Sequence, residues 1–180
     1  MRDKIINMIS NRLYIIAILL MAFLRMSAKV DYKYIVETYN PNTEHGLIYI
    51  DKQEMTLSLY NNDGSLLVEY PMACGRNIGK KIKAGDNKTP EGVFSVEQIQ
   101  DSSKWGHDFH DGKGFIKDAY GPWFIRLKTG FRGIGIHGTH DPASIGTRAS
   151  EGCIRLQNEN LVKLRPLVKI GMTVIIGPEE

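Results

Sequence analysis

The chain has 180 residues and a formal net charge of +3 at neutral pH. Its length predicts a single domain, large enough to bury a core without help from a metal or a disulfide. The first 28 residues hold four basic residues and one acidic residue, so the rest of the chain carries 19 of each sign. This balance excludes a global positive field, and we expect no binding to nucleic acid.

Residues 1–28 are typical of an export signal. Arg2, Lys4 and Arg12 precede an apolar run at 13–24, which matches a signal-peptide core and is shorter than the ~20 residues of a full membrane span. Met26 spoils the small-residue pattern before Ala28, so membrane attachment through an uncleaved segment 13–24 stays an open alternative. Both outcomes place the domain outside the cytoplasm, in the periplasm or cell envelope. We expect a polar linker at 29–45 and the folded domain at 46–180.

The folded part is predicted to consist mainly of strands. Clusters of β-forming residues and the turn sequence Asn61-Asn62-Asp63-Gly64 indicate an early hairpin. Asn158 is expected to cap a helix through Val168, although Pro166 threatens its last turn. The fold class is therefore mainly β with one or two helices, as a β-sandwich or partly open barrel. The expected strands are 47–51, 55–60, 66–72, 93–99, 123–127, 133–136 and 172–176.

Two long loops interrupt these strands. Residues 75–89 are rich in Gly and Lys, and lysines in such a loop are usually solvated, with binding of a substrate carboxylate as the alternative. Residues 100–122 carry several aromatic side chains, among them Trp105 and Tyr120. This loop has enough apolar surface to pack as a lid over a cleft, and the alternative is an ordinary surface loop pinned by its aromatic residues.

The most informative segment runs from His137 to Cys153. A cysteine nucleophile needs an imidazole or another positive neighbour to favour its thiolate, and His137 can serve as that base. Gly152 removes a side chain where a substrate must approach, and the backbone N–H groups of Gly152 and Cys153 are candidate donors to an oxyanion. The alternative is a structural cysteine buried between core residues.

The wording of this segment resembles a known family. Ile136-His137-Gly138-Thr139, Ser144-Ile145-Gly146 and Ser150-Glu151-Gly152-Cys153-Ile154-Arg155 resemble the signature of L,D-transpeptidase catalytic domains, the YkuD-like family that remodels peptidoglycan. Upstream, Thr89-Pro90-Glu91-Gly92-Val93-Phe94 and Tyr70-Pro71-Met72-Ala73-Cys74-Gly75 resemble two earlier family motifs. The resemblance runs from about Leu47 to Ile176 and implies the same mixed β fold.

The resemblance implies roles for individual residues. Cys153 matches the nucleophile and His137 the general base, whose imidazole the family orients with a backbone carbonyl, here that of Gly138. Ser150 and Arg155 match positions that line the site, and Arg155 is expected to recognise a stem-peptide carboxylate. We also expect substrate contacts from Tyr120 and Trp123. His140 is either a supporting residue or simply an exposed polar one.

The implied reaction is acyl transfer on peptidoglycan stem peptides without a cofactor. Cys153 would form a thioester with the third stem residue and release the terminal D-amino acid, and an amine would then resolve the thioester. Water as the acceptor would make the protein an L,D-carboxypeptidase. A non-catalytic cell-wall binding module is a further alternative. A papain-like protease is disfavoured because such enzymes place the cysteine well before the histidine.

Three further features concern Glu151, Cys74 and a possible metal site. Many family members read Ser-His-Gly-Cys, whereas Glu151 stands here in place of that histidine, and a desolvated carboxylate would raise the pKa of the neighbouring thiol. We expect Cys74 to be a free thiol, because a disulfide would remove the nucleophile. We predict no metal site, since the candidate ligands follow no zinc-binding spacing; they are His107, Asp108, His110, Asp111, His137 and His140.

Overall fold

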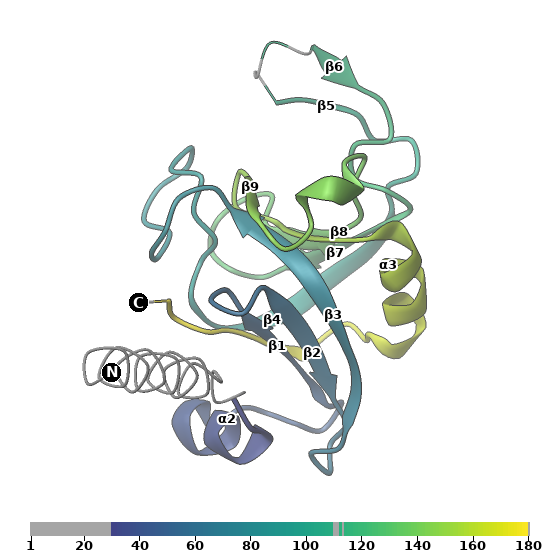
Figure 1. Ribbon diagram of the computed structural model, residues 1–180. Helices are drawn as coiled ribbons and strands as arrows, with labels where there is room; N and C mark the ends of the chain where they lie inside the picture. The colour runs from purple at the N-terminus through teal and green to yellow at the C-terminus, as the bar shows by residue number, and fades with distance from the viewer. Residues whose placement is uncertain (1–29, 110–111, 113, 180) are drawn as a thin grey trace, which may run out of the picture.

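The computed structural model describes residues 30–109, 112 and 114–179. Within them, one nine-stranded sheet has the order β10-β8-β7-β4-β11-β1-β2-β3-β9, and a separate pair of strands forms β5-β6. Figure 1 shows the large sheet wrapped around the centre of the molecule, with helix α3 on one flank and helix α2 below. The predicted export segment lies outside the described residues.

The elements are short, as the sequence predicts, and most strands lie within a few residues of their predicted positions. The helical elements are α2 (Tyr32–Tyr39), η1 (Pro142–Ser144), α3 (Asn158–Leu164) and η2 (Arg165–Leu167). The strands are β1 (Leu47–Asp51), β2 (Thr56–Tyr60), β3 (Leu66–Gly75), β4 (Gly92–Asp101), β5 (His107–Asp108), β6 (Phe115–Ile116), β7 (Trp123–Leu127), β8 (Gly135–His137), β9 (Arg148–Ser150), β10 (Ile154–Leu156) and β11 (Thr173–Ile176).

Strand β10 closes the sheet on itself. It pairs in parallel with β8 and, on its other side, antiparallel with β3, where Arg155 lies opposite Ala73 and Leu156 opposite Met72. Since β3 and β10 are both members of the nine-stranded sheet, their pairing turns the sheet into a barrel. The prediction of a mainly β, barrel-like fold is confirmed.

Alternation along β1 separates two apolar clusters. Ile48 and Ile50 face the barrel interior, where they join the main core. Leu47 and Tyr49 face outward and pack with Ile35 of helix α2, because successive side chains of a strand point to opposite faces. Helix α2 therefore covers the outside of the barrel at this strand.

Helix α2 lies in the stretch that the sequence analysis assigns to a linker, 29–45. The Asp31 side chain accepts a hydrogen bond from the backbone N–H of Tyr34 and caps the helix, which ends at Asn40 in the left-handed conformation. Ile35 is completely buried. The expectation of a linker is wrong for this helical part, because one buried isoleucine and a capped turn dock it onto the barrel.

Helix α3 ends earlier than the predicted helix. Its regular part stops at Leu164, and Arg165–Leu167 continues as a 3₁₀ turn that contains Pro166, as expected where proline removes a backbone donor. Leu161 and Leu164 are buried in the core, whereas Leu167 is 39% exposed. Leu167 therefore does not belong to the buried face that Leu161 and Leu164 form.

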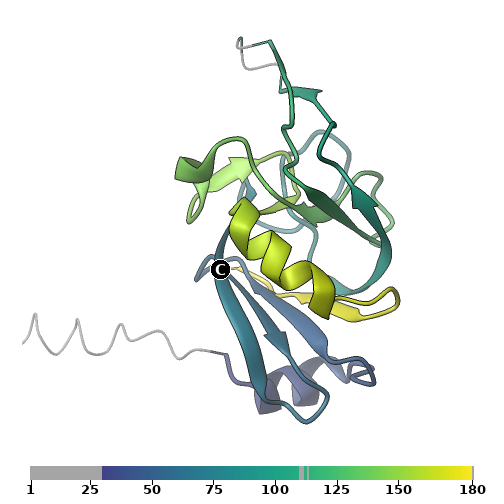
Figure 2. The same ribbon diagram turned by 90° about the vertical axis from the view of Figure 1, so that its right-hand side faces the viewer.

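The aromatic-rich segment 100–122 contains the β5-β6 pair. Figure 2 shows this arm extending away from the barrel beyond β7 and β8. Its base contacts the domain through Trp105, whose ring packs against Tyr120 and Phe124 at centroid distances of 6.1 and 5.6 Å.

Among the described residues, none of the helices has the length and apolar character needed to cross a membrane.

Candidate active site

The outer face of strands β10, β8 and β7 carries the residues of the His137–Cys153 segment. Ile154, Ile136 and Ile125 on these strands point into the core. On each strand, the residues next to these isoleucines therefore point outward. Arg155 lies level with His137, which in turn lies level with Phe124.

Cys153 immediately precedes β10, and continuing the β10–β8 register by one residue places it level with Gly135, two residues before His137 and on the same outer face. Parallel pairing of β10 with β8 is what brings the two residues together, although sixteen positions separate them in the sequence. The structure thus places the predicted nucleophile and the predicted base on one surface.

His137 is held in one orientation by its surroundings. Its Nδ1 lies 2.6 Å from the carbonyl oxygen of Gly138, and since a carbonyl only accepts hydrogen bonds, Nδ1 carries the proton. Phe124 stacks on the imidazole with an interplanar angle of 9°, and Tyr120 meets it edge-on. This arrangement leaves Nε2 with its lone pair free of a proton, which is the state a general base requires. The contact expected between His137 and the Gly138 carbonyl is present.

Burial keeps the side chains of both His137 and Cys153 neutral. The pKa of His137 falls to about 3, chiefly through burial and secondly through the positive charge of Arg155. The pKa of the Cys153 thiol rises to about 11, again chiefly through burial; a backbone hydrogen bond from Gly135 and the charges of Arg155 and Arg126 act in the opposite direction. The sulfur donates a hydrogen bond to the carbonyl oxygen of Gly133 at 3.1 Å. The resting pair is therefore a thiol and a neutral imidazole.

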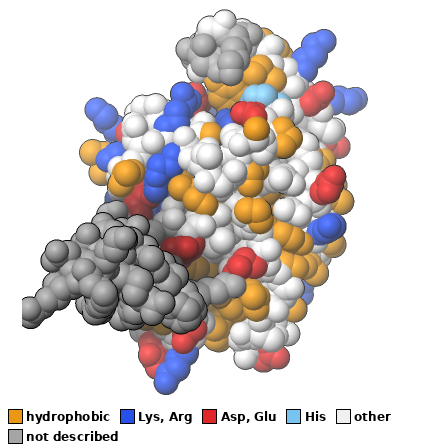
Figure 3. Space-filling view, in the orientation of Figure 1, with side chains coloured by type: hydrophobic (Ala, Val, Ile, Leu, Met, Phe, Trp, Pro, Cys, Tyr) orange, Lys and Arg blue, Asp and Glu red, His pale blue; other side chains and the backbone are white. Residues whose placement is uncertain are grey.

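Cys153 opens onto a pocket of about 600 Å³. Its walls include Tyr120 and Glu151 together with the loop that joins β7 to β8 and part of the segment between β3 and β4. Lys81 also lines it, but its ammonium group is buried against Asp86 at 2.7 Å. Lysines of the loop 75–89 were expected to be solvated, and for Lys81 that expectation is wrong. Figure 3 shows other Lys and Arg side chains gathered on the side of the molecule where Figure 1 places the β3–β4 segment.

Ser150 holds the turn that leads into Cys153. Its hydroxyl donates to the carbonyl oxygen of Cys153 at 2.6 Å and accepts from the backbone N–H of Gly152 at 3.0 Å. The side chain is almost fully buried. Ser150 therefore contacts the backbone of the turn. It is not exposed to substrate, although the sequence predicted that it lines the site. The Gly152 N–H is occupied by this bond, so it is not a free donor for an oxyanion, and of the two predicted donors only the Cys153 N–H remains.

Thr89 fixes the same turn from a second side. The Thr89 hydroxyl donates to the carbonyl oxygen of Gly152 at 3.0 Å and accepts from the backbone N–H of Gly75 at 2.9 Å. Gly152 has a φ of +135°, and a Cβ there would lie 2.7 Å from the carbonyl oxygen of Lys88. Glycine is therefore required at this position. The Thr-Pro motif is visible in the sequence, but this role of Thr89 is not.

Asn158 supports the segment that follows His137. Its side-chain oxygen accepts from the backbone N–H of Thr139 at 2.9 Å, and a Cβ at Gly138 would lie 2.1 Å from the same oxygen. Close approach of these groups explains the glycine after His137. Asn158 was expected to cap helix α3. That expectation is wrong, because the capping position is Gln157 and its side chain makes no capping hydrogen bond.

Arg155 is buried beneath the arm. Its guanidinium lies 4.9 Å from the centre of the Phe109 ring, and its Nε has no hydrogen-bond partner among the described residues. Only 5% of the residue is exposed. Phe109 also stacks on the exposed ring of His140, 5.3 Å away. The geometry thus gives Arg155 an electrostatic effect on Cys153 and His137, but access to a peptide carboxylate only if Phe109 moves.

Of the two aromatic residues expected to contact substrate, the structure brings one to the site. Tyr120 lines the Cys153 pocket, and its ring lies 4.8 Å from that of His137. Trp123 instead packs against the hydrophobic core with its ring under the guanidinium of Arg165 at 4.9 Å. Trp123 is therefore not one of the residues that surround Cys153, and the expectation for it is wrong.

Glu151 links the turn before Cys153 to two neighbouring segments. Its carboxylate lies 3.5 Å from Nη2 of Arg76, just after β3, and 3.3 Å from Nε2 of His107 on the β5-β6 arm. The side chain is 41% exposed. Its negative charge contributes to the raised pKa of Cys153, in the direction expected from the sequence.

Cys74 is buried in β3, and both cysteines are free thiols, as predicted. Nη1 of Arg148 lies 3.4 Å from the Cys74 sulfur. Among the described residues, no three side chains of His, Cys, Asp or Glu are grouped so that they could hold a metal ion. His110 and Asp111 from the candidate ligand set lie outside those residues.

The family model for the L,D-transpeptidase catalytic domain, YkuD, matches residues 45–176. The chain belongs to this family. One curated relative, YkuD of Bacillus licheniformis, is 30% identical to the chain over 139 residues. These residues are 77% of this chain and 70% of that protein. Escherichia coli K12 YbiS is 28% identical over 145 residues, which cover 74% of this chain but only 45% of YbiS. Both are named as L,D-transpeptidases.

Solved L,D-transpeptidases share the fold. An L,D-transpeptidase from Mycobacterium smegmatis matches with a TM-score of 0.54 and 24% identity, over 73% of this chain and 58% of that one. The catalytic domain of the Enterococcus faecium L,D-transpeptidase matches with a TM-score of 0.54 and 22% identity, over 76% of this chain and 99% of that domain. At this identity the likeness concerns the barrel and its topology.

Proposed function

We propose that this L,D-transpeptidase family member transfers acyl groups between peptidoglycan stem peptides through a thioester on Cys153. The observation that carries the proposal is the placement of Cys153 and His137 on one outer face of β10 and β8, with the imidazole tautomer fixed by Gly138. A nucleophile beside a base that a third group orients is the common arrangement of covalent acyl transfer.

In the first step, the Cys153 sulfur attacks the carbonyl carbon of the third stem residue. The thiol turns from Gly133 toward the imidazole, and His137 Nε2 takes its proton. The backbone N–H of Cys153, which donates to no described group, is our donor for the developing oxyanion. The C–N bond then breaks, the proton passes from His137 to the departing D-amino acid, and a thioester remains.

In the second step, an amine of a neighbouring stem peptide attacks the thioester. His137 takes a proton from the amine, the carbon–sulfur bond breaks, and the thiol is restored. We propose a diaminopimelate side chain as that amine, giving a cross-link between the third residues of two stems. The donor amide supplies the bond energy, so the reaction balances without a cofactor.

Incubation of the protein with purified muropeptides, followed by mass spectrometry, tests this function. A cross-linked dimer with release of the D-amino acid supports transpeptidation. A shortened monomer alone replaces it with L,D-carboxypeptidase activity. Unchanged muropeptides with retained binding replace both with a wall-binding module. Cys153→Ala is the control, since the proposal requires that variant to form neither product.

We also propose that the domain acts in the cell envelope. Support comes from the basic residues before the apolar run 13–24 and from the chemistry of the proposed substrate. Fractionation of cells producing the full chain tests the location. Recovery in the envelope with the first residue at 1 indicates attachment through 13–24, a mature chain starting near 29 indicates cleavage, and recovery in the cytoplasm overturns the proposal.

A further inference from the structure

The strand ladder that places Cys153 also places an arginine beside it. Arg126 on β7 lies level with Gly135 on β8, and continuation of the β10–β8 register places Cys153 level with Gly135 from the other side. Two strand spacings separate the Cα atoms of Cys153 and Arg126, about 10 Å. Both side chains point outward, so the arginine and the nucleophile face the same space.

An aromatic floor lies between the two residues. Gly135 has no side chain, and the Phe124 ring takes that space: a Cβ on Gly135 would lie 2.4 Å from it. The Arg126 guanidinium lies 5.1 Å from the centre of the same ring. A pocket of about 320 Å³ opens here between Trp105, Tyr120 and Arg126. It shares Tyr120 and Gly133 with the Cys153 pocket, so the two are adjoining parts of one surface.

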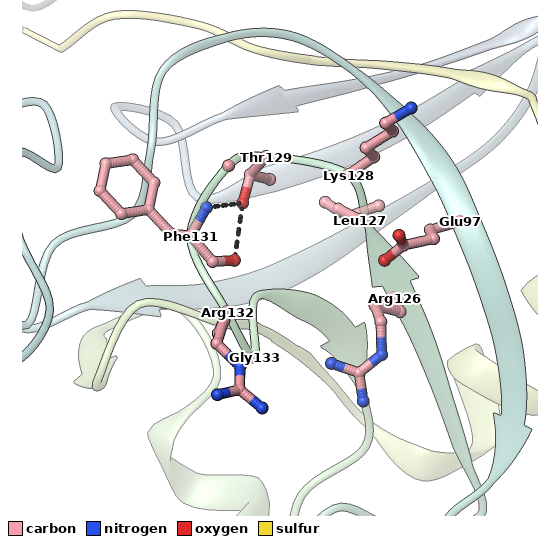
Figure 4. Close-up of a pocket in the computed structure, with 9 residues that line it drawn as sticks. Glu97, Arg126, Leu127, Lys128, Thr129, Phe131, Arg132 and Gly133 are labelled. Carbon is pink, nitrogen blue, oxygen red and sulfur yellow. Dashed lines mark hydrogen bonds between the residues drawn. The ribbon is translucent and has the colours of Figure 1, made fainter.

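The Arg126 guanidinium is positioned but not neutralised. Nε and Nη2 donate to the side-chain oxygen of Gln100 on β4 at 3.4 and 3.3 Å. No carboxylate of the described residues forms an ion pair with the Arg126 guanidinium. Its Nη1 donates a hydrogen bond to none of the described residues. Figure 4 shows the guanidinium groups of Arg126 and Arg132 extending toward the same side of a second pocket, of about 580 Å³.

Three other cationic side chains near Cys153 are engaged or covered, and a fourth, Arg132, is an exposed residue of the loop that lines the Cys153 pocket. Arg76 pairs with Glu151, and Lys81 pairs with Asp86. Arg155 is buried under Phe109. Arg126 differs from Arg132 because Gln100 and the Phe124 ring hold its guanidinium in place, while part of its donor capacity stays free.

We propose that Arg126 binds the terminal carboxylate of the acyl-donor peptide. The inference rests on the proposed function, in which the departing residue is a D-amino acid whose free carboxylate lies a few bonds from the scissile carbonyl. With that carbonyl at Cys153, the departing residue extends over Phe124 and Gly133, and its carboxylate reaches the guanidinium. Arginine suits this task because its planar donors match a carboxylate.

The test compares two synthetic stem tetrapeptides, one with a free terminal carboxylate and one with a carboxamide in its place. For the wild-type protein we expect kcat/KM for release of the terminal residue to be about ten- to a hundredfold higher with the free acid, the range of a charge-assisted hydrogen bond. Arg126→Gln should bring this ratio to within about threefold of one, and Arg126→Lys should restore part of it.

Lys128→Gln is the matched control, because it removes one positive charge from the same loop region while its side chain points away from Arg126 (Figure 4). It should keep the wild-type ratio. A merely structural effect of Arg126 on Phe124 would lower both rates and leave the ratio unchanged. Equal rates for the two peptides with the wild-type protein, or an unchanged ratio in Arg126→Gln, would overturn the assignment.

The proposed function and the carboxylate site fail in different ways. Absence of turnover with both peptides contradicts the function, and equilibrium binding of the same peptides to Cys153→Ala then tests the site by itself. Tighter binding of the free acid by about tenfold or more, abolished by adding Arg126→Gln, supports the site. Equal binding of both peptides rejects it.

Discussion

The Ser150 hydroxyl donates to the carbonyl oxygen of Cys153 at 2.6 Å and accepts from the N–H of Gly152 at 3.0 Å. One buried side chain thereby closes the turn that carries Cys153, the proposed nucleophile. The Cys153 sulfur is placed by this backbone closure and by the pairing of β10, while its own hydrogen bond goes to Gly133. Preorganisation of the site therefore depends on residues that do not touch the reacting bond.

Ser150→Ala should loosen this turn. Loss of both hydrogen bonds at a buried site should lower the free energy of unfolding by about 1–3 kcal/mol and reduce kcat by tenfold or more. Ser144→Ala is the control, since that buried hydroxyl donates to Asp141 in another turn. Denaturant titration and steady-state kinetics measure both effects. If the two variants lose stability alike and neither loses kcat, Ser150 does not position the nucleophile.

Thr89 should show the same dependence from the opposite side of the turn. Thr89→Val keeps the shape but leaves the Gly152 carbonyl and the Gly75 N–H without a partner, so we expect a loss of about 2–4 kcal/mol in unfolding free energy. Thr89→Ser retains the hydroxyl and should retain most of the stability and activity. Equal behaviour of the valine and serine variants in denaturant titration would show that the hydroxyl bridge has no importance.

The neutral resting pair predicts a specific pH dependence. The pKa of Cys153 is raised to about 11 and that of His137 is lowered to about 3, so neither group carries a charge between those values in the free protein. Alkylation of Cys153 by iodoacetamide should therefore rise steadily with pH from 6 to 9, because the thiolate fraction grows about tenfold per pH unit below the thiol pKa.

A thiolate–imidazolium pair would behave differently. It would give fast alkylation at pH 5 to 6 and a plateau across neutral pH. Quantifying the Cys153 adduct by mass spectrometry distinguishes the two profiles, and Cys74 serves as an internal comparison because it is a second, fully buried thiol. A plateau below pH 7 would contradict the neutral pair.

Glu151→Gln should raise the reactivity of Cys153 by a modest factor. The Glu151 charge disfavours the thiolate, so its removal lowers the thiol pKa. Because the side chain is 41% exposed, solvent screens the effect, and we expect alkylation at pH 8 to increase by no more than about fivefold. Glu159→Gln, on helix α3, is the control. A slower reaction in Glu151→Gln would mean that the links to Arg76 and His107 matter more than the charge.

Much of the fold could be predicted because it depends on local signals. The strand at 47–51 has the predicted bounds, since alternating apolar residues there serve two faces of one sheet. The pairing of β10 with β3 could not be predicted, because it joins segments that are far apart in the chain and consists of only two residue pairs. Helix α2 was missed because one buried residue, Ile35, gives little periodic signal.

The site was predicted unevenly for a similar reason. Cys153 and His137 have reactive side chains whose identity indicates their chemistry. Thr89 and Asn158 act by hydrogen bonds to backbone groups of distant segments, and such contacts leave no spacing pattern in a single sequence. Ser150 bonds to the backbone of its own turn, a role that its match to a site-lining position did not indicate. The Asn158 signal was visible but was assigned to the nearer helix end, where asparagine is a frequent cap. Arg126 required the strand register to become a candidate.

Intact-protein mass spectrometry after mixing with a free stem tetrapeptide, without an acceptor amine, tests the central role of Cys153 most directly. The account predicts an adduct with the mass of the stem tetrapeptide less its terminal D-amino acid. Digestion of the protein should place this adduct on the fragment that contains Cys153, and Cys153→Ala should form no adduct. Release of the D-amino acid by Cys153→Ala at the wild-type rate, with no adduct on either protein, would contradict it.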